Sequence, residues 1–122
     1  MDTKDVAQQF TQLCKDGKFE EAGQRFWSDK IVSIEPMEGP MARLEGLAAV
    51  KGKGEWWYAN HEIHSATAEG PYVSGDQFAL RFSMDITPKT GETAGKRMQM
   101  TEVALYTVKD GKVVEERFFY GG

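Results

Sequence analysis

Glu102 is the residue of this sequence with the clearest potential for acid–base chemistry. It interrupts an alternating run whose other members on the same face are apolar or aromatic: Met98, Met100, Ala104, Tyr106 and Val108. An isolated charge is costly to bury, so the carboxylate is expected to reach solvent, to be paired inside or to belong to a site. Desolvation of its ionised form would raise the pKa of Glu102 toward the range that is useful for proton transfer.

His61 is the predicted partner of this carboxylate. Residues at helical spacing in its segment are Leu47, Val50, Gly54, Trp57 and His61. They predict a helix over residues 47–61 that presents His61 to the same space as Glu102, where the two would form an acid–base pair. A structural role, in which Glu102 bonds to Arg117 or His61 on a neighbouring element, is the alternative that the sequence leaves open.

A pocket beside Glu102 would draw on residues from several segments. The candidates are Glu35, Trp56, Trp57, Met84, Met100, Tyr106 and Tyr120. Trp57 shares the stripe of His61 and is expected in the core. Trp56 lies about 100° further round the helix and is better placed for a pocket or an interface.

No cofactor and no metal are predicted. Residues 52–57 begin like a dinucleotide fingerprint but have tryptophan where the third glycine belongs. His61 and His64 are three residues apart, a spacing that serves a metal only on a helix, and His64 falls in a predicted strand.

The elements that position these residues follow from changes in hydrophobic period. Helices are predicted over residues 3–16, from residue 18 and over 47–61, and strands over 30–35, 62–69 and 77–87. A long hairpin over residues 96–122 turns at Asp110-Gly111, and residues 36–46, 70–76 and 88–95 are predicted connections. Helices followed by a run of strands predict one α+β domain over residues 1–122, with a curved antiparallel sheet wrapped around three helices.

Composition argues against several classes of protein. The net charge is −4 and the basic residues are scattered, so a nucleic-acid-binding surface is not expected. The N-terminal sequence lacks the basic start and apolar run of a signal peptide, and no stretch approaches membrane-spanning length, so a cytoplasmic protein without membrane contact is expected. The single cysteine, Cys14, falls on the apolar stripe of the first helix and is expected to fill the core.

Short motifs along essentially the whole chain carry a family resemblance. They are Gly46 with Ala49-Val50, Trp56-Trp57, Asn60-His61-Glu62, the strand from Arg81-Phe82 to Asp85, Glu102, and Asp110-Gly111-Lys112 leading to Phe118-Phe119-Tyr120. With these motifs the chain resembles the ketosteroid isomerase and nuclear transport factor 2-like superfamily, specifically its SnoaL-like branch of polyketide cyclase-related domains. The resemblance implies a cone-shaped, cystatin-like domain with an apolar cavity between sheet and helices, usually dimeric through the outer face of the sheet.

Two functions from different classes follow from these observations. The first is isomerisation, cyclisation or hydration of a small apolar carbonyl compound, with Glu102 as base and His61 or a tyrosine as hydrogen-bond donor. The second is non-catalytic binding of a small hydrophobic molecule in the same cavity, with Glu102 held in a structural bond.

The outer face of the predicted sheet indicates a homodimer. Arg81, Asp85, Thr101, Val103 and Leu105 share this face. Its apolar members are better hidden than solvated, and the two charged residues are expected to form an outer-face ion pair or a dimer contact.

Overall fold

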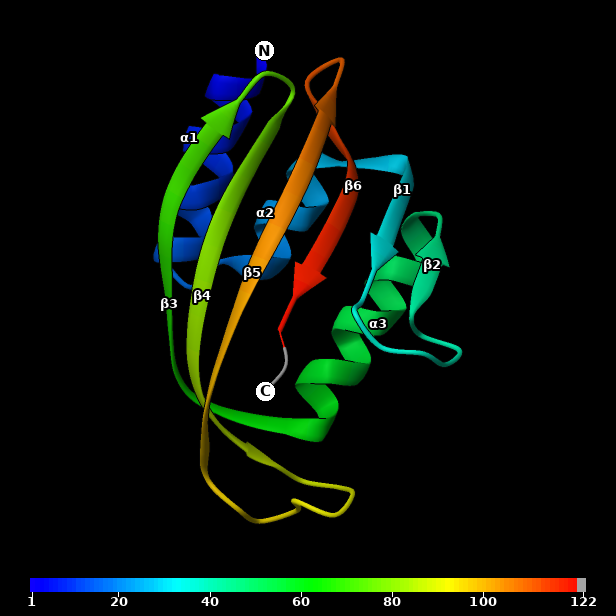
Figure 1. Ribbon diagram of the computed structural model, residues 1–122, viewed down its shortest axis with the longest axis vertical. Helices are drawn as coiled ribbons and strands as arrows, with labels where there is room; N and C mark the ends of the chain where they lie inside the picture. Colours follow the sequence, from blue (N-terminus) through cyan, green and yellow to red (C-terminus); the bar gives the residue numbers. More distant parts are fainter. Residues whose placement is uncertain (121–122) are drawn as a thin grey trace.

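A computed structural model describes residues 1–120 as three helices and one six-stranded sheet (Figure 1). The elements are α1 (Thr3–Lys15), α2 (Phe19–Phe26), β1 (Trp27–Ile34), β2 (Arg43–Glu45), α3 (Leu47–Asn60), β3 (His61–Ser74), β4 (Gln77–Pro88), β5 (Met98–Lys109) and β6 (Lys112–Phe119). The strand order across the sheet is β2-β1-β6-β5-β4-β3. The predicted α+β fold with a curved sheet and three helices is confirmed.

The sheet is mixed rather than wholly antiparallel. Strands β3 to β6 form an antiparallel meander, but β1 pairs with β6 in parallel, with Ser33 opposite Glu116 and Ile34 opposite Arg117. An antiparallel direction is imposed only on strands joined by a hairpin. Because β1 enters the sheet directly from α2 and lies beside the last strand of the chain, its direction could not be read from the sequence.

The final hairpin has the predicted turn and pairing. Asp110 and Gly111 both adopt left-handed backbone conformations, with φ of 53° and 76°, as a tight turn between twisted strands requires. Strands β5 and β6 pair antiparallel from Lys109 opposite Lys112 to Val103 opposite Phe119. This register sets Phe118 on the same face as Ala104 and places the end of β6 beside Glu102.

Two segments that were predicted to be connecting loops, residues 70–76 and 36–46, contain strand residues. Residues 70–76 were expected to link two strands, but β3 continues through them to Ser74, and its pairing with β4 shifts between Glu69 and Tyr72. Gly70, with φ of 129°, makes this irregularity possible, since residues with a side chain rarely adopt that conformation. The loop at 36–46 contains β2, which has only three residues and pairs with β1.

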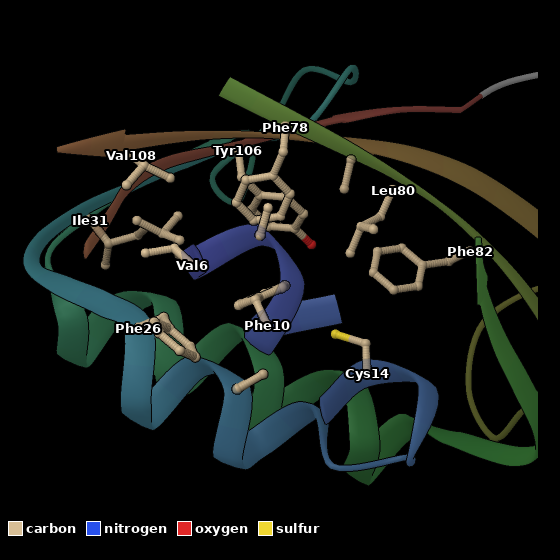
Figure 2. Packing of buried hydrophobic residues seen from close by; sticks show 14 of the residues in the cluster. Val6, Phe10, Cys14, Phe26, Ile31, Phe78, Leu80, Phe82, Tyr106 and Val108 are labelled. Atoms are coloured by element: carbon tan, nitrogen blue, oxygen red, sulfur yellow. The ribbon is translucent and has the colours of Figure 1, made fainter. Parts of the chain in front are cut away.

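The helices cover one face of the sheet, and α1 lies against β3, β4 and β5 (Figures 1 and 2). The ring of Phe10 on α1 packs against Phe78 and Tyr106, with centroids 5.8 and 4.8 Å away. Cys14 fills the adjoining core as predicted, and burial raises its pKa to about 12, so its thiol is not poised to react.

Candidate functional site

A cavity of about 550 Å³ lies between the helices and the sheet. Its wall includes every residue predicted for the site: Glu35, Trp56, Trp57, His61, Met84, Met100, Glu102, Tyr106 and Tyr120. Core residues such as Phe10, Cys14 and Phe82 form the apolar part of the same wall. The cavity therefore has an apolar body with a small number of polar groups, which is typical of a small-molecule site.

Glu102 lies on this wall without a partner. Strand β5 holds it opposite Phe82 of β4, with its side chain on the face that carries buried Ala104 and Tyr106. Burial raises the pKa of Glu102 to about 7, the carboxylates of Glu35 and Glu116 act in the same direction, and the charge of Lys53 opposes them. Within residues 1–120 the Glu102 carboxylate makes no hydrogen bond or ion pair, so a ligand in the cavity can reach it.

The predicted pair of Glu102 and His61 is wrong. Helix α3 ends at Asn60, and the His61 ring folds back on the last turn, where Nδ1 lies 2.9 Å from the carbonyl oxygen of Trp57. The ring also stacks on that of Trp57, with centroids 3.7 Å apart. His61 is thus bound to the end of its own helix, because the helical stripe that was extrapolated through it stops one residue earlier.

The tyrosines do not bond to Glu102 either. Tyr106 is almost fully buried between Phe10 and Phe78, and burial raises its pKa well above the ordinary value. The Tyr120 hydroxyl lies 3.9 Å from the sulfur of Met37, and its pKa is raised by burial and by the nearby Glu35 carboxylate.

A second polar cluster was not predicted from the sequence. Lys53 of α3 donates a hydrogen bond to Glu35 Oε1 over 2.7 Å and another to Ser33 Oγ. The Ser33 hydroxyl in turn donates to Glu116 Oε2 at 2.7 Å, and Lys53 Nζ lies 3.8 Å from the same oxygen. These four residues (Ser33, Glu35, Lys53 and Glu116) are called the lysine cluster below; Glu35, Lys53 and Glu116 line the cavity, and Ser33 is buried behind them.

The carboxyl of Glu116 is the most deeply buried acid of the cluster. Burial raises its pKa, while the charge of Lys53 and the Ser33 hydrogen bond favour the ionised form. The buried indole N–H of Trp27 also favours ionised Glu116, although its geometry falls short of a hydrogen bond. Removal of the cluster's one cation would leave two carboxylates in a poorly solvated space, an arrangement that is strongly unfavourable.

The cluster escaped sequence reasoning because its members come from three separate elements. Ser33 and Glu116 are neighbours only through the parallel pairing of β1 and β6. Lys53 stands between Gly52 and Gly54 on α3, where Val50 is the single fully buried residue among 47–60. The helix therefore has no clear apolar stripe from which the position of Lys53 could be predicted. The alternation of Ser33 and Glu35 along the strand predicted at 30–35 was the one available signal.

The outer-face residues pair differently from the prediction. Arg97 forms a two-point ion pair with Asp85, with its Nη2 2.7 Å from Oδ2, and this pair lowers the pKa of Asp85. Arg81 lies 3.8 Å from Glu69 instead of pairing with Asp85. The proposed bond between Arg117 and Glu102 is also absent, since Arg117 stands opposite Leu105 and lies 3.8 Å from Glu115.

Comparison with known proteins identifies the family. A model of the SnoaL-like domain matches residues 1–120. The chain belongs to the SnoaL-like domain family. No protein with a curated description matches its sequence at a significant level.

Solved structures share the fold of this SnoaL-like domain. A Mesorhizobium loti protein, provisionally described as a SnoaL-like polyketide cyclase and also as a carbohydrate phosphatase, is 51% identical over 98% of this chain and 100% of that one, with a TM-score of 0.93. A Xanthomonas campestris protein of unknown function with a cystatin-like fold is 20% identical over 100% and 92% of the two chains (TM-score 0.76). A Catenulispora acidiphila protein with a ketosteroid isomerase-like fold is 14% identical over 98% and 87% (TM-score 0.72). The last two show likeness of fold alone.

No three His, Cys, Asp or Glu side chains within residues 1–120 are grouped as metal ligands would be. No helix in the same range is long and apolar enough to span a membrane.

Replacing Glu35 with glutamine should lower the pKa of Glu102 below 7. The Glu35 charge is one of the causes that raise it, and the amide would also leave Lys53 free to attract the Glu102 carboxylate. Titration of glutamate side-chain carbons by carbon-13 NMR would measure the shift. Glu69→Gln, on the exposed outer face, is the control and should change nothing. A Glu102 pKa that is the same in Glu35→Gln would show that the two carboxylates do not interact.

Proposed function

We propose that this SnoaL-like domain catalyses proton transfer on a small apolar carbonyl compound, in an isomerisation, cyclisation or hydration, with Glu102 as the general base. The observation that carries the proposal is the unpaired Glu102 carboxylate on the cavity wall, with a pKa raised to about 7. A general base is most effective when its pKa lies near the working pH, because it is then both ionised and basic.

The chemical step moves one proton and one electron pair. Glu102 takes a proton from the carbon next to the carbonyl, the C–H bond breaks, and its electron pair shifts to the carbonyl oxygen as an enolate forms. Protonated Glu102 then returns the proton to another carbon, which completes an isomerisation. Alternatively the enolate carbon attacks a second carbonyl, which closes a ring, and Glu102 gives its proton to the new alkoxide oxygen.

The charges in the cavity favour a neutral substrate. Three carboxyl groups, Glu35, Glu102 and Glu116, interact electrostatically with one another and with the ammonium of Lys53. A phosphate ester would bring further negative charge into this space, and like charges in a poorly solvated site repel strongly. Hydrolysis of a phosphorylated carbohydrate, which one relative's description suggests, is therefore disfavoured for this chain.

Hydrogen exchange with solvent is a direct test, because it needs no second reaction: Glu102 removes a proton, exchanges it with deuterium oxide and returns a deuteron to the same carbon. Unlabelled 2-tetralone and cyclohex-3-enone, two small apolar ketones, would be incubated with the protein in deuterium oxide and followed by NMR. We expect deuterium to enter next to the carbonyl faster than in buffer, and cyclohex-3-enone to convert to its conjugated isomer. If both ketones bind without exchange above the buffer rate, the non-catalytic binding function replaces this one.

We also propose that the domain is a homodimer through the outer face of its sheet. Val103 and Phe119 are neighbours across β5 and β6 and are 39% and 49% exposed, and Leu105 lies on the same face. Such an apolar patch is unfavourable in water and suits an interface between two copies.

Val103→Glu should convert the dimer to a monomer, because two copies of the new charge would face each other across the interface. Light scattering at micromolar concentration measures the change, with Gln8→Glu on the exposed side of helix α1, away from the sheet's outer face, as the control. A wild-type protein that is monomeric under these conditions would contradict the proposal, and so would a Val103→Glu variant that is still dimeric.

A further inference from the structure

We propose that Lys53 is a second catalytic residue, whose ammonium group binds the carbonyl oxygen of the substrate and stabilises the enolate that forms when Glu102 removes the proton. The inference rests on the proposed function and assigns a position to the substrate, with its carbonyl oxygen at the lysine cluster and its acidic C–H bond at Glu102.

The ammonium of Lys53 has a donor to spare. It carries three N–H groups. Two of them serve Glu35 and Ser33. Glu116 Oε2 at 3.8 Å and the Phe118 ring, whose centroid is 4.8 Å away, are too distant for a hydrogen bond. Lys53 also lines the cavity and its side chain is 14% exposed, so its third N–H is available to a ligand there.

Lys53 is held in place before any substrate binds. Ser33 near the end of β1 and Glu35 just after that strand both accept hydrogen bonds from the ammonium, and Ser33 is itself bonded to buried Glu116 on β6. A donor that is already oriented does not have to reorganise as charge develops, which is the main advantage of an enzyme site over water. Lys51 on the same helix also borders the cavity, but it is exposed and has no comparable support.

Charge moves toward Lys53 during the proposed step. Before the step the negative charge is on the Glu102 carboxylate, and afterwards it is on the enolate oxygen, while the total charge of the cavity is unchanged. Lys53 already interacts electrostatically with Glu102 across this space. The positive charge of Lys53 would stabilise an enolate oxygen within hydrogen-bond distance of Nζ more than it stabilises the Glu102 carboxylate, which is not bonded to it. The activation free energy of proton removal is therefore lowered.

The donors expected from the sequence are less suitable. His61 Nδ1 is engaged with the Trp57 carbonyl oxygen, and its ring is stacked on the Trp57 ring. The Tyr120 hydroxyl lies close to the Glu35 carboxylate, whose charge makes it a poorer acid and competes for its proton. Lys53 supplies a positive charge, which the phenol of Tyr120 does not.

The test uses 2-naphthol, a planar phenol whose ionised oxygen resembles an enolate and whose neutral and ionised forms have different absorption spectra. Spectra of the bound probe over a pH series would report its ionisation in wild type, Lys53→Met, Lys53→Arg and the control Lys109→Met, an exposed lysine outside the cavity. At a fixed mildly alkaline pH we expect the ratio of ionised to neutral bound naphthol to be at least ~10-fold higher in wild type than in Lys53→Met, with Lys109→Met like wild type and Lys53→Arg between the two. Equal ionisation in wild type and Lys53→Met would overturn the proposal.

A measurement on the wild type covers the case in which Lys53→Met does not fold. The Lys53 ammonium signal in a nitrogen-15 NMR spectrum, assigned by its loss in Lys53→Arg, should shift when naphthol is added. If that signal does not move while the probe binds in the cavity, Lys53 does not contact the ligand and the proposal fails.

Failure of the proposed function is distinguishable from failure of this inference. The naphthol experiment requires no turnover, and in Glu102→Gln it should still show ionised probe at Lys53. Where the ketones do react, Lys53→Met should lower kcat by roughly 10²- to 10³-fold with little change in KM, as loss of one oxyanion donor does. An unchanged kcat with a raised KM would show that Lys53 only binds substrate, and would overturn its catalytic role.

Discussion

Replacing Glu102 with glutamine should lower the rate of ketone exchange or turnover by roughly 10²- to 10⁴-fold, the range typical for loss of a general base. Glutamine keeps the shape of the side chain but cannot accept the proton. Because Glu102 has no hydrogen bond within residues 1–120, no protein contact is broken, and the affinity for a neutral ketone should be nearly unchanged. NMR exchange rates and equilibrium binding of 2-tetralone measure the two quantities separately.

Glu69→Gln is the matched control for this experiment, since it makes the same change on the exposed outer face. It should leave exchange and binding as they are in the wild type. A Glu102→Gln protein that is folded, binds the ketone and exchanges its protons at the wild-type rate would contradict the role of Glu102. A variant that unfolds instead would show that the carboxylate is structural.

The stability of the wild type should fall between about pH 4.5 and pH 7 because of Glu102. Its pKa is raised from 4.5 in an exposed setting to about 7 in the folded protein, so the folded state holds the proton more tightly than the unfolded chain. The full stabilising contribution of the protonated form is therefore present below pH 4.5 and is lost as the pH rises through 7. The difference of about 2.5 pH units corresponds to roughly 3 kcal/mol in the free energy of unfolding.

Glu102→Gln should remove this dependence, because the amide resembles the protonated acid at every pH. We expect the variant to be more stable than the wild type by up to about 3 kcal/mol at pH 8, and similar to it at pH 4. Urea unfolding of both proteins across this range measures the difference, in which the contributions of other carboxylates cancel. A difference that does not vary with pH would mean that the carboxylate has an ordinary pKa, which would favour the non-catalytic binding function.

The gain in stability and the loss of activity have the same physical origin. A carboxylate that is kept partly desolvated beside two other carboxylates is unfavourable for folding. The same environment raises its basicity enough to remove a proton from carbon. Functional sites commonly combine such destabilisation with activity, and Glu102→Gln separates the two in one variant.

Local features of the sequence predicted much of the fold. The alternation in residues 77–87 and 98–108 predicted which faces of β4 and β5 are buried, and Asp110-Gly111 predicted the hairpin between β5 and β6. These features depend on neighbours in the chain. The parallel pairing of β1 with β6 and the existence of β2 depend on residues far apart in sequence, and periodicity carries no information about them.

By itself, the sequence determined that Glu102 points to the helix-covered face of β5, because a strand's side chains alternate whatever lies around them. Only the tertiary structure decided what that carboxylate meets. His61 is bound to the carbonyl oxygen of Trp57 at the end of α3. The charges that act on Glu102 come instead from Glu35 after β1, Lys53 on α3 and Glu116 on β6. The physical reason is that the direction of a side chain is a property of its own element, whereas its electric field, its solvation and hence its pKa are set by every group packed around it.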